Sequence, residues 1–311
     1  MGAGQLEQVP PPSEPSLPLP GAMGEAARTL SPAGWTNITA LIVMLAGPFV
    51  LAGLVAMDVI RPGSFKRHKP VMPSEKEPVI LLCAGMIVFA SSAVGYSLAY
   101  SLALPFPAEV SSLTVKGQAV LQAGSYLVGV PVALVMAVLA CGGMRRMVGR
   151  WDGPIGVGLV AAAYTVVSAC SAIAVWAAER LSDHAPNPIA HETLRLIKDE
   201  PASWPAIVMS ACAVIGAPIV EEVVYRLFLQ TTLLKVTRSP WLSVILTAAL
   251  FAGRHTGVVP WHALPPLFVL GLAFGIAFAR TGRLGVPIVM HAAFNAGNIA
   301  LTLWGPIQDS P

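Results

Sequence analysis

The feature that most constrains this chain is a series of apolar runs, most of them long enough to cross a lipid bilayer. About 20 consecutive apolar residues are needed to span roughly 30 Å of hydrocarbon as a helix. Five runs reach this length, three shorter ones follow, and charged, proline or glycine residues separate them. The runs occupy residues 37–60, 78–104, 118–141, 154–178, 204–234, 240–255, 265–280 and 286–304. The sequence therefore predicts an all-α, polytopic membrane helical bundle with about eight transmembrane helices.

The composition agrees with a membrane protein. Of the 311 residues, 55% are hydrophobic and only 11% are charged, whereas a soluble domain carries about 25% charged residues. The net charge of +3 is small and dispersed, so we expect the lipid bilayer as a partner and no nucleic acid. The four cysteines lie in apolar runs without CxxC spacing, which indicates neither a disulfide framework nor a metal-binding knuckle.

The two ends of the chain differ from the apolar runs. Residues 1–36 are rich in Pro, Gly, Ser and Glu and cannot bury a core, so they are expected to form a disordered, Pro-rich tail. No basic segment precedes an apolar one there, which argues against a cleaved signal peptide. Residues 306–311 are expected to be a short tail.

The distribution of Lys and Arg predicts the orientation, because these residues are enriched in cytoplasmic loops. With eight spans and the N-terminus outside, 13 of the 19 basic residues fall on the inner side and 6 on the outer side. Both termini are therefore expected outside.

The run at 204–234 contains three charged residues, Glu221, Glu222 and Arg226. A charge near the centre of a bilayer costs about 2.5–3.5 kcal/mol, so such groups are expected to be paired, to face a polar cavity or to carry out chemistry. Residues four apart share a helical face, which predicts a charge-balancing pair between Glu222 and Arg226. Glu221 lies about 100° around the helix and remains as the free carboxylate. A purely structural charge cluster is the alternative.

The next polar residue in an apolar setting is His255, which shares a helical face with Phe251. Glu221 and His255 each lie about 24 Å along their helices from a turn at 237–239. An antiparallel pair of helices would bring them together, and a carboxylate with an imidazole can hold and deprotonate a water. A packing role is the alternative for a lone histidine.

A third pair, His291 and Asn295, also shares one helical face. Two hydrogen-bond donors aimed in one direction can stabilise an oxyanion, although Asn295 could instead join two helices. Counting from Gly285 places His291 shallower in the membrane than Glu221, unless the connection at 281–285 dips inward.

The order Glu-Glu-x-x-x-Arg, Phe-x-x-x-His and His-x-x-x-Asn resembles that of the CPBP family, which includes the type II CAAX prenyl endopeptidases. The resemblance covers about 204–304 and implies a catalytic core over 201–305, preceded by variable transmembrane helices at 37–200. It implies that Glu221 activates a water with His255, that Glu222 and Arg226 shape and balance the site, and that His291 and Asn295 bind the oxyanion. The sequence departs from the family at Leu227, often Gly there, and at Arg254, beside His255.

The expected activity is that of an intramembrane endopeptidase acting on a membrane-anchored protein or peptide. No cofactor is required, although a zinc ion held by Glu221, His255 and His291 is an open alternative. The protein is expected to be an integral multi-pass membrane protein, in the inner membrane if the host is bacterial. Two other functions remain open: a non-catalytic immunity or scaffold protein that binds a membrane peptide, and an ion-coupled transporter that uses Glu221 and Glu222.

Overall fold

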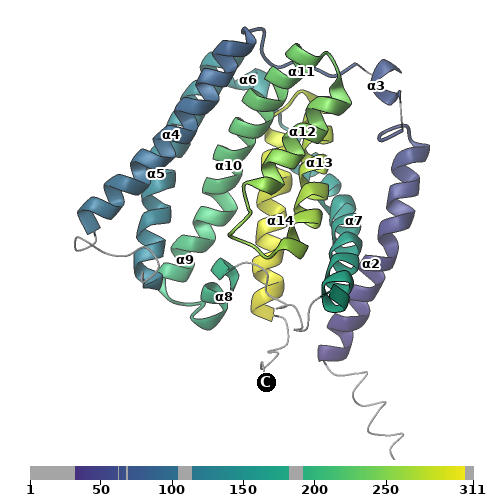
Figure 1. Ribbon diagram of the computed structural model, residues 1–311, viewed down its shortest axis with the longest axis vertical. Coiled ribbons are helices and arrows are strands. Elements are labelled where there is room, and N and C mark those ends of the chain that lie inside the picture. Colours follow the sequence, from purple (N-terminus) through teal and green to yellow (C-terminus); the bar gives the residue numbers. More distant parts are fainter. Residues whose placement is uncertain (1–31, 62, 68, 104–113, 182–191, 305–311) are drawn as a thin grey trace, which may run out of the picture. The chain divides into compact units, whose positions relative to one another are not determined.

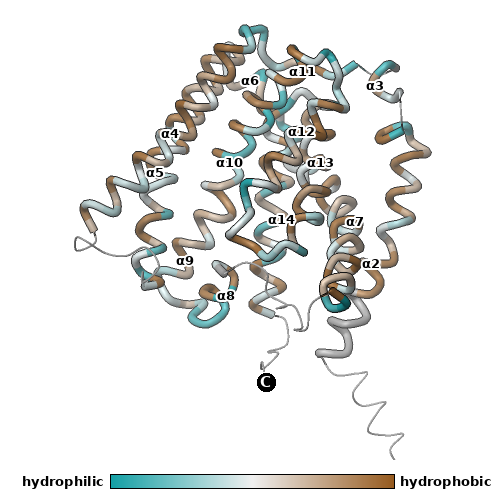
Figure 2. Tube along the Cα trace, in the orientation of Figure 1, coloured by the Kyte–Doolittle hydropathy of each residue, from teal (hydrophilic) through white to brown (hydrophobic). Residues whose placement is uncertain are grey.

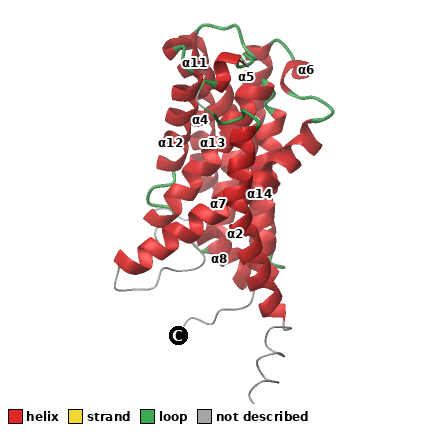
Figure 3. Ribbon diagram, turned by 90° about the vertical axis from the view of Figure 1, so that its right-hand side faces the viewer, coloured by secondary structure: helices red, strands yellow, loops and turns green. Residues whose placement is uncertain are grey.

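A computed structural model describes residues 32–61, 63–67, 69–103, 114–181 and 192–304. The tail expected at 306–311 and residues 1–31 of the tail expected at 1–36 lie outside these residues, whereas 32–36 are helical. Within the described ranges the chain forms helices and connecting loops without a strand (Figure 3), which confirms the all-α fold. The described residues from Leu41 onward form one compact unit.

Six helical segments in the described part are long and apolar enough to cross a membrane, and two shorter apolar helices accompany them. These findings confirm an integral multi-pass membrane protein, with a number of apolar helices close to the predicted eight. The six segments are Pro78–Ala103, Val115–Cys141, Met144–Leu181, Trp204–Thr237, Trp261–Thr281 and Gly285–Trp304, and the shorter helices are Leu41–Ala56 and Pro240–Gly253.

The individual helices carry the labels of Figure 1. In chain order they are α2 (Pro32–Ala56), α3 (Ser64–Arg67), α4 (Pro78–Ala103), α5 (Val115–Cys141), α6 (Met144–Met147), α7 (Asp152–Leu181), α8 (Glu192–Asp199), α9 (Trp204–Ala211), η2 (Cys212–Gly216), α10 (Ala217–Glu222), η3 (Val223–Gln230), α11 (Thr231–Thr237), α12 (Pro240–Gly253), η4 (Trp261–Ala263), α13 (Leu264–Thr281) and α14 (Gly285–Trp304). Helix α2 begins at Pro32, earlier than the expected start near Asn37. Proline suits a first helical turn because its missing N–H would have no partner there.

Local capping explains where the helices of the C-terminal half begin and end. The Ser203 side chain accepts a hydrogen bond from Ala206 N at the start of α9, and Ser239 accepts one from Leu242 N at the start of α12. Helix α13 ends at Gly282, which has a φ of 64° and donates its N–H to Phe278 O. The caps at Ser239 and Gly282 accompany the tight connections from α11 to α12 and from α13 to α14.

Several basic loops meet at one end of the bundle. Lys235 Nζ donates to Lys76 O at 2.7 Å, Val71 N donates to Ala279 O at 3.1 Å, and Arg283 Nη1 lies 3.1 Å from Asp152 Oδ1. The loops after α2, α11 and α13 therefore share an end, where Figure 2 shows hydrophilic residues. The sequence assigned these loops to one side, and the contacts agree. Which side faces the cytoplasm remains a prediction.

The helix pairs pack around the segment Trp204–Thr237. Helix α4 packs on α5, α12 on α13, and α14 on α7, while α10 and η3 contact members of all three pairs. Figure 1 shows α10 between the α4–α5 pair and α14. The charged residues predicted in this segment are therefore at the centre of the bundle, where Figure 2 shows hydrophilic positions within an apolar helix.

Two π-helical stretches, η2 and η3, flank the short α-helix α10. π-Helical turns are rare and occur frequently at functional sites. Two contacts accompany them here. The ring of Tyr126 lies where a Cβ on Gly216 would be, so that only glycine fits, and Thr231 Oγ1 donates to Arg226 O, five residues earlier, at 3.3 Å. The wide turns thus bracket Glu221 and Glu222.

Candidate functional site

Glu222 and Arg226 form a buried ion pair. Arg226 Nε lies 2.8 Å from Glu222 Oε2, and neither side chain is exposed. The predicted pair at i, i+4 is therefore present. Removing one partner of such a pair costs about 3–5 kcal/mol because the other charge is left buried.

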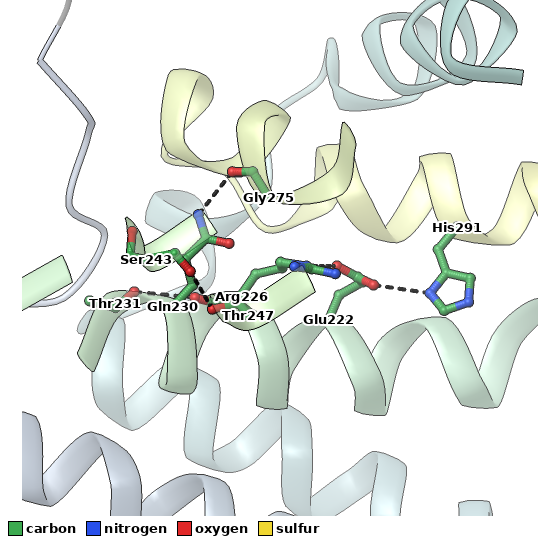
Figure 4. A network of polar contacts seen from close by, with 8 residues as sticks. All are labelled: Glu222, Arg226, Gln230, Thr231, Ser243, Thr247, Gly275 and His291. Carbon is green, nitrogen blue, oxygen red and sulfur yellow. Dashed lines mark hydrogen bonds and ion pairs between the residues drawn. The ribbon is translucent and has the colours of Figure 1, made fainter. Parts of the chain in front are cut away.

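The other carboxylate oxygen of Glu222 accepts a hydrogen bond from a residue on α14. His291 Nδ1 lies 3.0 Å from Glu222 Oε1, and the imidazole is buried (Figure 4). Both oxygens of Glu222 are thus engaged, and the pair expected from the sequence is in fact a three-residue network. Because the carboxylate accepts, Nδ1 carries the proton, and a neutral His291 presents Nε2 as an acceptor.

The depth of His291 differs from that given by counting from the helix start. The first residues of α14 and the residue before them, Leu284, Gly285 and Val286, are buried in the protein. Helix α14 therefore starts inside the bundle, and its seventh residue, His291, reaches the level of Glu222. The connection after α13 dips inward, which the sequence left open.

Two phenylalanines enclose the guanidinium of Arg226. Its Cζ lies 5.5 Å from the ring centroid of Phe251 and 5.9 Å from that of Phe274. Nη1 and Nη2 are buried and have no hydrogen-bond partner within the described part of the chain. Cation–π attraction between the guanidinium and the two rings offsets part of the free energy that burying these unpaired N–H groups costs. His291 stacks on Phe274 at 5.1 Å and meets Phe251 edge-on at 5.9 Å.

His255 lies just beyond the end of α12, not within it. Its Nδ1 is 2.8 Å from Phe251 O, and its ring packs on the ring of Phe251 at 5.1 Å. A carbonyl oxygen only accepts, so Nδ1 again carries the proton and Nε2 of the neutral ring is an acceptor. The predicted shared face of Phe251 and His255 is present, and Phe251 joins His255 to the Glu222–Arg226–His291 network.

Glu221 has surroundings unlike those of Glu222. Its Oε2 is buried and has no hydrogen-bond partner among the described residues. Tyr126 on α5 and Tyr225 on η3 both interact electrostatically with Glu221 and with Arg254. Tyr225 contacts Phe251 edge-on, with ring centroids 5.5 Å apart, and the Phe251 ring in turn packs on the ring of His255. In the described contacts Glu221 and His255 are not directly hydrogen-bonded; aromatic rings link their positions.

Asn295 and His291 both point from α14 toward the helix that carries the glutamates. Asn295 Nδ2 donates to Ala213 O in η2 at 2.7 Å, whereas His291 donates to Glu222. The shared face is as predicted, but each residue uses one donor within the protein. The second hydrogen on Asn295 Nδ2 stays available, since an amide nitrogen has two.

The residues expected for a zinc ion do not form a metal site. In the described part of the chain, no three His, Cys, Asp or Glu side chains are placed to hold a metal ion together. His291 uses Nδ1 for Glu222 and His255 uses Nδ1 for Phe251 O. Nε2 of both rings remains available as an acceptor, but the side chains of Glu221, His255 and His291 are not gathered into one group in the residues that the structure describes.

Some site residues have no sequence signal of their own. Phe274 reads as an ordinary apolar residue, yet it covers both Arg226 and His291. Tyr126 lies on α5, far from the motifs in sequence. Gln230 was detectable, because it lies four residues after Arg226, and its Nε2 donates to Gly275 O at 2.8 Å (Figure 4).

Comparison with known proteins concerns the segment that holds this site. The family model described as type II CAAX prenyl endopeptidase Rce1-like matches residues 203–297, less than half of the chain. The match confirms the resemblance inferred from the motifs and supports a membrane protease. An "uncharacterized 24.3 kDa protein" of Escherichia coli is 29% identical over 91 residues, which are 29% of this chain and 42% of that protein. No solved structure gives a significant match.

Proposed function

We propose that this protein is an intramembrane endopeptidase that hydrolyses a peptide bond of a membrane-anchored protein or peptide. One observation carries the proposal: adjacent carboxylates in one helix have opposite surroundings. Both oxygens of Glu222 are bonded to cationic or donor groups, whereas Glu221 Oε2 is buried without a partner in the described residues. Glu222 therefore has a structural role in the network, and Glu221 is the carboxylate available to act in catalysis.

In the proposed reaction, Glu221 and His255 hold a water, and Glu221 accepts its proton as the oxygen attacks the scissile carbonyl carbon. The tetrahedral intermediate carries a negative oxygen. Collapse breaks the C–N bond, and the proton held by Glu221 passes to the departing amine. The mechanism requires no metal ion.

The roles of Asn295 and His291 follow from their remaining hydrogens. Asn295 offers the second hydrogen of Nδ2 to the oxyanion. His291 can donate from Nε2 only as an imidazolium, because its Nδ1 proton is directed at Glu222. The hydrogen bond to Glu222 fixes the orientation of that imidazole. The Glu222–Arg226 pair therefore supports the oxyanion site through His291.

The test is cleavage by the purified protein in liposomes, with a farnesylated CAAX peptide and the same peptide without the prenyl group. Glu221→Gln is expected to lower kcat by about 10²–10⁴-fold, as is typical for loss of a general base. His255→Ala is expected to act in the same direction. Glu179→Gln, at an exposed carboxylate in the last turn of α7, is the matched control.

Unchanged turnover in Glu221→Gln would refute the assignment. Binding of either peptide by the wild-type protein without cleavage would instead support the scaffold function. Cleavage of only the farnesylated peptide would define the substrate as prenylated. Full activity after exhaustive chelation would support the metal-free mechanism, and its loss with recovery on adding zinc would contradict it. In a bacterial host, we place the enzyme in the inner membrane.

A further inference from the structure

A cleft lies at the charged end of the bundle, away from the glutamates. It has a volume of about 720 Å³ and lies between residues 63–66 and 69–72 on one side and the turn that joins α11 to α12 on the other. Figure 1 shows α3 and α11 at this same end. Its volume is within the range of small-molecule sites, about 300–1,000 Å³.

The charged residues that line the cleft are all basic. They are Lys66, Lys69, Lys235 and Arg238. No acidic residue lines it, and within the described part of the chain none of the four forms a salt bridge. Lys235 donates to Lys76 O at 2.7 Å, which fixes its ammonium group in place. Four cations without counter-charges favour an anionic ligand.

Two aromatic residues also line the cleft. Trp241, in the first turn of α12, packs edge-on against Phe65 with ring centroids 5.0 Å apart. Its Nε1 is buried and has no hydrogen-bond partner among the described residues. This N–H is screened from solvent, so Trp241 presents its ring, and not Nε1, to the cleft.

The position of the cleft decides which anion it suits. Helix α11 ends at Thr237 and α12 begins at Pro240, so this turn lies where the hydrocarbon gives way to headgroups. Tryptophan is enriched at that level of a membrane. Below the cleft, α12 exposes Leu242, Ile245 and Leu246, an apolar path from the basic groups toward the bilayer. A free phosphate would use the cations but not this path.

We propose that this cleft binds the headgroup phosphate of an anionic phospholipid, with its acyl chains along the exposed face of α12. Basic pockets between transmembrane helices recognise such headgroups. The inference is independent of the proposed protease activity. It assigns a lipid to the first turn of α12, the helix whose other end precedes His255.

The test is native mass spectrometry of the detergent-purified protein with added phosphatidylglycerol or phosphatidylcholine. The variant Lys66→Gln/Lys69→Gln/Arg238→Gln is expected to bind phosphatidylglycerol at least about 10-fold more weakly, since each basic group contributes electrostatic attraction. Phosphatidylcholine binding is expected to be unchanged. The control Arg145→Gln/Arg146→Gln/Arg150→Gln removes the same charge from another loop and is expected to retain the wild-type affinity.

Equal losses in both triple variants would show attraction by total charge and would overturn the proposal. Displacement of phosphatidylglycerol by millimolar inorganic phosphate, without lipid preference, would identify a free-anion site and overturn the lipid assignment. Lys69→Glu reverses the charge of one exposed lysine that lines the cleft. It is expected to weaken phosphatidylglycerol binding several-fold, and it tests the cleft even if the triple variant fails to fold. Wild-type affinity in this variant would count against the proposal.

Discussion

The outer helices and the inner helices of this bundle use different means to hold together. In Trp204–Thr237 and Trp261–Thr281, 44% and 50% of the most apolar window is buried, compared with 28% in Pro78–Ala103 and 17% in Met144–Leu181. The inner segment Trp204–Thr237 contains Glu222 and Arg226, which bond to His291 on the neighbouring α14. The outer pair, α4 and α5, relies instead on close backbone contact at Gly95 and Gly124.

The difference follows from the solvent. In lipid, apolar surfaces gain little by leaving the bilayer, so helices associate through close packing and interhelical hydrogen bonds. Small residues supply the packing between α4 and α5. Charged and polar residues supply directional contacts in the centre, such as the Glu222–Arg226 ion pair and the Glu222–His291 hydrogen bond. Stability is thus shared between the two regions, whereas the polar contacts of the proposed reaction are confined to one.

The largest expected effect on stability comes from breaking the central network. Arg226→Met leaves Glu222 buried with only His291 as a partner, and we expect a loss of about 3–5 kcal/mol in the free energy of unfolding. An SDS-unfolding titration in mixed micelles would measure it. The double variant Glu222→Gln/Arg226→Met removes both charges and is expected to lose less. Wild-type stability in the single variant would contradict the central role of the pair.

A smaller effect is expected from overpacking the outer pair. A Cβ on Gly124 would meet Ala99 Cβ and Gly95 O at less than normal contact distance. Gly124→Leu is therefore expected to lower the free energy of unfolding by about 1–3 kcal/mol, in the same titration. Gly158→Leu on α7 is the control, because no atom lies within 4 Å of the new Cβ there. Equal losses in both variants would point to helix propensity or lipid contact in place of packing.

The smallest effect is expected at the edge of the central network. Gln230→Leu removes the hydrogen bond from Nε2 to Gly275 O, and we expect a loss of about 0.5–1.5 kcal/mol in the free energy of unfolding. Gln122→Leu on α5 is the matched control, because the Gln122 side chain makes no hydrogen bond to the residues that the structure describes. A loss as large as that in Arg226→Met would mean that Gln230 also supports the ion pair, so that the network extends further than its direct bonds.

The sequence predicted what depends on local helix geometry. The Glu222–Arg226 pair and the shared face of His291 and Asn295 follow from a spacing of four residues, and both are present. The Glu222–His291 bond did not follow, because counting assumed that every helix starts at the membrane surface. Helix α14 starts inside the protein. Phe274 could not be predicted, since nothing in an apolar run shows which ring will cover an arginine.

The shortness of α12 has a consequence for solvation. Its 14 residues span about 21 Å, less than the roughly 30 Å of hydrocarbon in a bilayer. The loop that follows α12 is therefore expected within the thickness of the membrane. Figure 1 shows this loop at a level between the two ends of α14. Non-helical backbone at that depth is tolerated only inside protein or beside a water-filled cavity. Arg254, Thr256 and Gly257 are exposed there. We therefore expect the bilayer to thin or to admit water at this loop, which would give water a route to His255.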